Sequence, residues 1–188
     1  MPGRDGIPSV TEVLSIFQDV SRIRPDVLAQ AAERGTIVHK ACAAIASGLW
    51  SLGVPPDCAG YVKSFERWFD LVDEVHLVEA ELAHPVYGYM GHLDLCVTLK
   101  GDKDPRVVDL KTPVTEGPTW QAQIAAYEEL VDVNTKMQLK QSGSLRLKAD
   151  GGFPKFNQNN GDAGALNAFL NALAAYRYFM AASRYFKS

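Results

Sequence analysis

Long apolar runs are missing from this sequence. No stretch of roughly eighteen or more apolar residues occurs, so no membrane-spanning helix and no membrane partner are expected. The first five residues, Met1 to Asp5, also lack the apolar segment of a secretory signal peptide. We therefore expect a cytoplasmic protein.

Cysteine is scarce as well. The three cysteines, Cys42, Cys58 and Cys96, are odd in number and far apart, and they form neither a C-x-x-C pair nor a zinc-binding spacing. An iron–sulfur cluster held by four cysteines is excluded by this count. Free thiols in a reducing compartment are the expected state.

An excess of basic residues is the third absence. The net charge is −3 and the pI is about 5.8. This balance by itself favours a small-molecule enzyme or a binding module over a nucleic-acid-binding protein. A local basic patch can nevertheless act without a global excess.

What is present is a pattern of helices followed by strands, within a length that fits one domain over 1–188. Apolar spacing predicts helices over about 9–14, 26–49, 57–72, 119–132 and from a cap at Asp162 onward, and strands over 75–82, 90–99 and 106–112. Residues 136–148 are expected to form a strand or hairpin and residues 157–161 a loop. This order predicts an α/β (α+β) fold with a mixed sheet, whose three middle strands form a meander.

The sequence also predicts a helix cap and the buried faces of three helices. Ser9 and Glu12 form a capping-box pattern at the first helix. The apolar stripes were expected to contain Val27, Leu28 and Ile45 in the second helix, Phe65, Trp68 and Val72 in the third, and Phe169, Leu173 and Phe179 in the last.

Two predicted strands carry carboxylates among core-forming residues. Side chains at i and i+2 share one face of a strand, so Asp109 and Lys111 lie together, while Val108 and Leu110 face a core. Asp94 alternates with leucines on the strand before, and the short connection allows an antiparallel pair that brings Asp94 close to Asp109. Glu79 and Glu81 lie one strand earlier, and either is a candidate acidic helper.

Such carboxylates favour a divalent cation. A carboxylate among apolar residues is costly unless it is paired or binds metal, and Mg²⁺ prefers oxygen ligands. A lysine on the same face can position a water molecule or stabilise charge on a phosphate. An isolated D-x-K triplet is more often a surface ion pair, so the surrounding motifs decide between the two interpretations.

Four motifs occur in order between about 34 and 127. They are Gly35 with His39 on a helix, Gly91-x-x-Asp94, Asp109-x-Lys111-Thr112, and Gln123-x-x-x-Tyr127. Together they resemble the RecB-like branch of the PD-(D/E)XK nucleases, and residues 8–11 and 145–147 resemble segments of phage-type exonucleases. The resemblance implies a restriction-endonuclease-like core.

The resemblance also implies roles for individual residues. Asp94, Asp109 and the Leu110 carbonyl would bind Mg²⁺ or Mn²⁺ in a two-metal site, His39 would be a further ligand, Glu79 would lie near the metals, Lys111 would act near the attacking water, and Gln123 and Tyr127 would contact DNA or order Lys111. Without the other motifs, His39 would be an ordinary core or surface histidine. Gln123 and Tyr127 have packing or surface roles as their alternative.

The expected activity is metal-dependent exonuclease action on linear DNA, single- or double-stranded, in recombination, repair or phage genome processing. A recombination or replication protein is a candidate partner, and the cytoplasm of a bacterium or of a phage-infected host is the expected location. Three alternatives stay open: a restriction-type or junction-resolving endonuclease, a non-catalytic DNA-binding subunit, and an unrelated ligand-binding protein. The basic residues that could build a DNA groove are Arg22, Arg24, Arg34, Lys63, Arg67, Lys136, Lys140, Arg146, Lys148 and Lys155.

Overall fold

The computed structural model describes residues 6–18, 21, 23–49, 53–113, 115–159 and 163–182. Its elements run, in order, α1 (Val10–Ser15), α2 (Pro25–Ala46), α3 (Pro56–Phe69), β1 (Val72–Ala83), β2 (Met90–Leu99), β3 (Arg106–Lys111), α4 (Trp120–Thr135), β4 (Gly143–Arg146), β5 (Lys155–Gln158) and α5 (Ala163–Ala182). The predictions for Arg22 and for the helix cap at Asp162 lie outside the described residues. None of the described helices is both long enough and apolar enough to cross a membrane.

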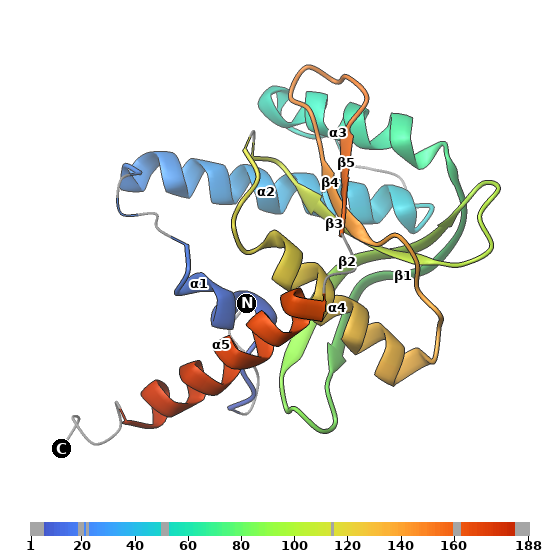
Figure 1. The fold of residues 1–188 in the computed structure, drawn as a ribbon. Helices are drawn as coiled ribbons and strands as arrows, with labels where there is room; N and C mark the ends of the chain where they lie inside the picture. The colour runs from blue at the N-terminus through green and yellow to red at the C-terminus, as the bar shows by residue number, and fades with distance from the viewer. Residues whose placement is uncertain are drawn as a thin grey trace.

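The five strands form one mixed sheet in the order β1-β2-β3-β4-β5. The first three strands are antiparallel neighbours, which confirms the predicted meander. β4 then lies parallel to β3, because α4 carries the chain back between them, and β5 returns antiparallel to β4. The fold is therefore mixed α/β, with helices flanking a mixed sheet (Figure 1).

Two apolar clusters cover the two faces of this sheet. On one face α2 and α3 bury Val38, Phe65 and Trp68 against Leu95, Val108 and Leu110. On the other face α4 packs with α1 and α5 over a cluster that includes Tyr89, Val107, Leu130 and Phe169. α5 then runs outward from the body at the lower left of Figure 1. Each face thus has its own helical layer, and the polar site lies where the two clusters meet.

The N-terminal capping box is confirmed. The Ser9 hydroxyl accepts a hydrogen bond from the Glu12 amide at 3.1 Å, and the Glu12 carboxylate accepts one from the Ser9 amide at 3.4 Å. The Met90 amide donates to the Pro8 carbonyl, which attaches this segment to the start of β2. The first helix is therefore held beside the strand that carries Asp94.

Several boundaries and faces were predicted wrongly. Val27 and Leu28 are exposed, because the first turns of α2 extend beyond the sheet, and Phe179 is exposed on the outward-running part of α5. Val72 begins β1 instead of ending α3. Residues 136–140 form no strand, and the loop expected at 157–161 includes the end of β5, which pairs with β4.

Candidate active site

The candidate site begins where β2 and β3 stop pairing. Their register runs from Val97 opposite Arg106 to Leu95 opposite Val108. One step further, the Leu110 amide donates to Asp94 Oδ2 at 2.6 Å, so a side chain replaces the next ladder contact. The N–H and C=O groups of one strand residue point to the same side, so the Leu110 carbonyl also faces β2. The diverging strands therefore leave room for polar groups between them.

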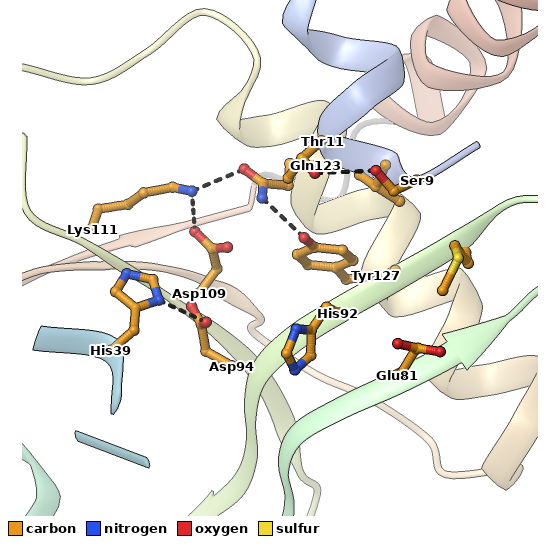
Figure 2. Close-up of a pocket in the computed structure, with 13 residues that line it drawn as sticks. Ser9, Thr11, His39, Glu81, His92, Asp94, Asp109, Lys111, Gln123 and Tyr127 are labelled. Atoms are coloured by element: carbon orange, nitrogen blue, oxygen red, sulfur yellow. Dashed lines mark hydrogen bonds and ion pairs between the residues drawn. The ribbon is translucent and has the colours of Figure 1, made fainter. Parts of the chain in front are cut away.

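Asp109 and Lys111 share one face of β3, as predicted. Lys111 Nζ lies 2.5 Å from Asp109 Oδ2 and donates to Gln123 Oε1 at 2.9 Å, and Gln123 Nε2 donates to the Tyr127 hydroxyl at 3.1 Å. Figure 2 shows this chain running from β3 to α4. Because Gln123 bonds to Lys111 through its oxygen and to Tyr127 through its nitrogen, this hydrogen-bond chain holds the Lys111 ammonium in one position.

Trp120 adds a contact that the sequence did not reveal. Its ring centroid lies 5.5 Å from Lys111 Nζ, within the range of a cation–π interaction. The Trp120 side chain is buried. It therefore packs in the core and also forms one wall around the Lys111 ammonium.

A second group of side chains gathers on the other side of Asp94. His39 Nδ1 from α2 lies 2.9 Å from Asp94 Oδ1 (Figure 2). Donor atoms of His39, Glu79 and Asp94 all lie within 4.8 Å of one another. Three segments distant in sequence, namely α2, β1 and β2, thus bring one imidazole and two carboxylates to a single point.

Glu79 has an unusual backbone conformation. Its φ is 47°, in the left-handed region that a non-glycine residue seldom adopts within a strand. His92, across on β2, lies with Nε2 2.8 Å from the Glu79 carbonyl oxygen and 3.1 Å from Glu79 Oε2. Because Ala80 is opposite Leu93 and Val78 is opposite Leu95, Glu79 lies beside Asp94. A histidine thus fixes both the backbone and the carboxylate of a strained residue at the site.

Glu79 and Glu81 are separated by this geometry. Glu79 belongs to the cluster with His39 and Asp94, whereas Glu81 lines the neighbouring cavity without joining that cluster. The left-handed turn at Glu79 also ends the simple alternation that would have put both acids on one face. Of the two candidates, Glu79 is the one placed to share a cation with Asp94.

The electrostatics of the site reflect its crowding. Burial raises the pKa of Asp109, with the neighbouring Asp94 charge adding to this and Lys111 opposing it. Burial would do the same to Asp94, but His39, the Leu110 amide and Lys111 outweigh it and lower its pKa. Burial and Asp94 also raise the pKa of Glu79. The acids therefore compete for too few positive partners.

His39 responds in the opposite sense. Burial alone would lower its pKa, but the Asp94 carboxylate raises the pKa of His39 to about 9. At neutral pH the protonated imidazole thus takes the place that a cation would occupy beside Asp94. A metal ion binding there would have to displace that proton.

Two adjoining hollows contain these groups and share His39, His92 and Asp94. One of them is also lined by Asp109, Lys111, Gln123 and Tyr127, together with Ser9, Val10, Thr11, Glu81, Met90 and Gly91. The other contains Glu79 with Ala32, Gly35, Thr36 and Lys40. Asp94 stands between them and is accessible from both sides.

Gly91 explains how α4 comes so close to β2. A Cβ at this position would lie 2.5 Å from Leu130 Cδ1 and 2.8 Å from Tyr127 Cε1. Any larger residue would push α4 away from the strand and separate the Gln123–Tyr127 pair from Lys111. The glycine of the G-x-x-D motif is therefore required by helix–strand packing.

The residues present fit a divalent metal. Asp109 Oδ2 is buried and, apart from its ion pair with Lys111, has no hydrogen-bond donor among the described residues. Carboxylate oxygens with one imidazole are ligands that suit Mn²⁺, and the carboxylates alone suit Mg²⁺. Asp94, Asp109, Glu79 and His39 would supply them, and the Leu110 carbonyl faces the same space.

The structure brings together all eight residues named from the sequence: His39, Glu79, Asp94, Asp109, Leu110, Lys111, Gln123 and Tyr127. Sequence reasoning missed His92 and Trp120 as neighbours of the site. The position of His92, two residues before Asp94 on the same strand, was a usable signal for the first. A scan against protein-family models found no match, and a search of curated proteins found no similar sequence.

Proposed function

We propose that this protein is a metal-dependent DNA exonuclease of the PD-(D/E)XK type, with the restriction-endonuclease-like fold of the RecB-like branch. The observation that carries the proposal is the convergence of Asp94, Asp109 and Lys111 where two antiparallel strands diverge. The mixed sheet with helices on both faces is compatible with that fold. The four sequence motifs supply the link to DNA, and the branch resemblance supplies the preference for DNA ends.

The charge balance supports a cation-dependent reaction. Glu79 and Asp94 cluster with His39, which is cationic only when protonated, and Asp109 forms an ion pair with Lys111. Mg²⁺ or Mn²⁺, most simply as a pair of ions, would supply an activated water and neutralise charge on the phosphate and the leaving oxygen. Asp94 and Asp109 would bind at the centre, with Glu79 and His39 on the far side of Asp94.

Lys111 is placed to orient the attacking water. Its ammonium is held by Asp109 on one side and Gln123 on the other, with the Trp120 ring alongside. When Asp109 turns to a cation, Lys111 keeps its bond to Gln123 and has free donors for a water or a phosphate oxygen. Gln123 and Tyr127 therefore act by ordering the lysine, which is one of the two roles expected of them.

A cleavage assay tests this proposal. End-labelled linear DNA, single- and double-stranded, and a closed circle are each incubated with Mg²⁺, Mn²⁺ or EDTA. The expected result is metal-dependent loss of linear DNA alone, abolished in Asp109→Ala and Lys111→Ala. Asp73→Ala, at an exposed residue of β1, is the matched control and should cleave normally.

Other outcomes have defined meanings. Opening of the circle would replace the exonuclease proposal with an endonuclease that uses the same residues. Binding of DNA without cleavage in either metal would indicate a non-catalytic subunit. Unchanged cleavage in both site variants would overturn the assignment of the site, provided that their thermal unfolding matches that of the wild type.

A further inference from the structure

A separate hollow opens directly beyond the reacting lysine. It is lined by Tyr61 of α3, by Thr112 and Pro113 just after β3, and by residues 146–150, which run from the last residue of β4 into the following turn. Because β3 and β4 run parallel, both end at this edge of the sheet. Thr112 follows Lys111 immediately in the chain, so the wall of this hollow begins one residue from the candidate site.

The charge in this hollow is opposite to that around Asp94. Arg146 and Lys148 line it, and Asp150 is the one acid there, with its Oδ1 accepting a hydrogen bond from the Gly152 amide at 2.8 Å. Arg34 of α2 does not line the hollow but lies next to its Tyr61 wall, with its guanidinium carbon 5.7 Å from the centre of the Tyr61 ring. Arg34 Nε is buried and has no hydrogen-bond partner among the residues that the structure describes. Cations therefore outnumber acids in this hollow.

The walls of the hollow are fixed relative to the site. The Leu147 amide donates to the Lys111 carbonyl at 2.8 Å, and the Lys148 amide donates to the Ser64 hydroxyl of α3 at 3.0 Å. α3 comes so close to the turn that a Cβ on Gly60 would lie 1.7 Å from the Ala149 carbonyl oxygen. These contacts bind α3, β3 and the end of β4 into one rigid unit, so a group bound here has a set position relative to Lys111.

We propose that this hollow binds an internal backbone phosphate of the DNA strand, next to the phosphate that is cut at Asp94 and Asp109. The inference rests on the proposed function and adds a positioning site to it. Arginine and lysine side chains are the usual phosphate partners, and arginine can hold two phosphate oxygens at once. A strand anchored there would pass from a basic hollow across Lys111 to the acidic, metal-requiring centre.

The test is DNA binding measured by fluorescence anisotropy in EDTA, where no cleavage occurs, over a series of salt concentrations. The double variant Arg146→Gln/Lys148→Gln should bind about tenfold more weakly, and the slope of log affinity against log salt should fall by about one. Arg146→Lys should retain most of the slope, because it keeps the charge. The charge-matched control is Lys100→Gln/Lys103→Gln, which removes two exposed lysines where β2 turns into β3, at the other end of the sheet.

The same titrations distinguish the failure of each proposal. Absence of salt-sensitive DNA binding by the wild type overturns the proposed DNA nuclease and this inference with it. Normal wild-type binding with an unchanged slope in the folded double variant overturns the inference alone. Oligonucleotides with and without a 5′-phosphate should show the same loss; a loss seen only with the phosphorylated end, or an equally strong effect of inorganic phosphate, would contradict an internal backbone phosphate.

Discussion

The two ends of β3 both carry buried charge, but they balance it differently. At the N-terminal end, Arg106 is almost fully buried and forms an ion pair with Asp102, and it also donates to Gln141 Oε1 at 3.1 Å. At the C-terminal end, Asp109 lies in a group of carboxylates that share Lys111 and a protonated His39. At the N-terminal end one cation is paired with one carboxylate, whereas at the C-terminal end the carboxylates outnumber the cations.

This difference separates a structural charge from a functional one. The Arg106 charge is matched by the exposed Asp102, so this pair is sufficient as a structural ion pair in the hairpin, although the buried Arg106 Nε has no hydrogen-bond partner among the described residues. A crowded set of acids whose pKa values are pushed apart, in contrast, is typical of a site that acts on a ligand. Substitutions at the two ends should therefore have opposite effects on stability and activity.

The largest effect is expected for Asp109→Asn. Cleavage should fall by at least about a thousandfold, because the central oxygen ligand becomes a neutral amide. The metal-free protein should be as stable as the wild type or more so, because burial holds the Asp109 carboxylate above its ordinary pKa and charging it is costly. Thermal unfolding with and without Mn²⁺ checks this, and only the wild type should gain stability from the metal. A strongly destabilised metal-free variant would place Asp109 with the structural charges.

Asp102→Asn should show the reverse. Arg106 loses its anionic partner while it stays buried, so the free energy of unfolding should fall by about 1.5–3 kcal/mol. Cleavage at a temperature where the variant is folded should be unchanged, since Asp102 lies at the opposite end of the strand. Urea unfolding and the cleavage assay on the same preparation measure both quantities. A loss of cleavage beyond the unfolded fraction would show that the two ends are coupled.

His92→Ala should weaken metal binding about tenfold without removing it. The substitution releases the Glu79 carbonyl and carboxylate, and outer partners of metal ligands have effects of roughly this size. Mn²⁺ binding measured by calorimetry gives the result independently of cleavage. His76→Ala, on β1 and bonded to Thr98, is the matched control. Equal Mn²⁺ affinity in the His92 variant and the wild type would remove Glu79 from the metal site.

The last prediction concerns the pH dependence of stability. His39 has a pKa of 6.5 in the unfolded chain and about 9 beside Asp94, so it binds protons more tightly when folded. The stability that this contact contributes is complete below pH 6.5 and is lost as the pH rises through about 9. In EDTA, wild type should therefore exceed His39→Gln by about 1–3 kcal/mol at pH 6, and the difference should shrink by pH 9.5. A gap that grows with pH would contradict the protonated His39–Asp94 pair.

The strands that carry the site were predictable because their signals are local. Alternation predicted strands over 90–99 and 106–112, which match β2 and differ from β3 by one residue, and the i, i+2 rule put Asp109 beside Lys111. The capping box at Ser9 is a four-residue pattern and was also confirmed. These features depend on neighbours in the chain, which the sequence shows directly.

The missed features depend on partners distant in sequence. β5 contains Asn157 and Gln158, so its composition is that of a loop. It forms a strand because it pairs with the edge of β4. The left-handed conformation of Glu79 is supported by His92 on another strand, and no pattern in the neighbouring sequence predicts it. Phe179 follows the apolar spacing of α5, but the helix has already left the sheet there. Periodicity identifies an apolar face of a helix, but it does not show where along the helix the neighbouring elements stop covering that face.

The spread of His39, Glu79, Asp94 and Asp109 over α2, β1, β2 and β3 also has a kinetic consequence. A site made from four segments is complete only after the sheet has formed and α2 has docked on it, which places it late in folding. A cation held there would stabilise the native state more than the transition state. It should therefore slow unfolding while leaving the refolding rate nearly unchanged, and so prolong the lifetime of the folded protein.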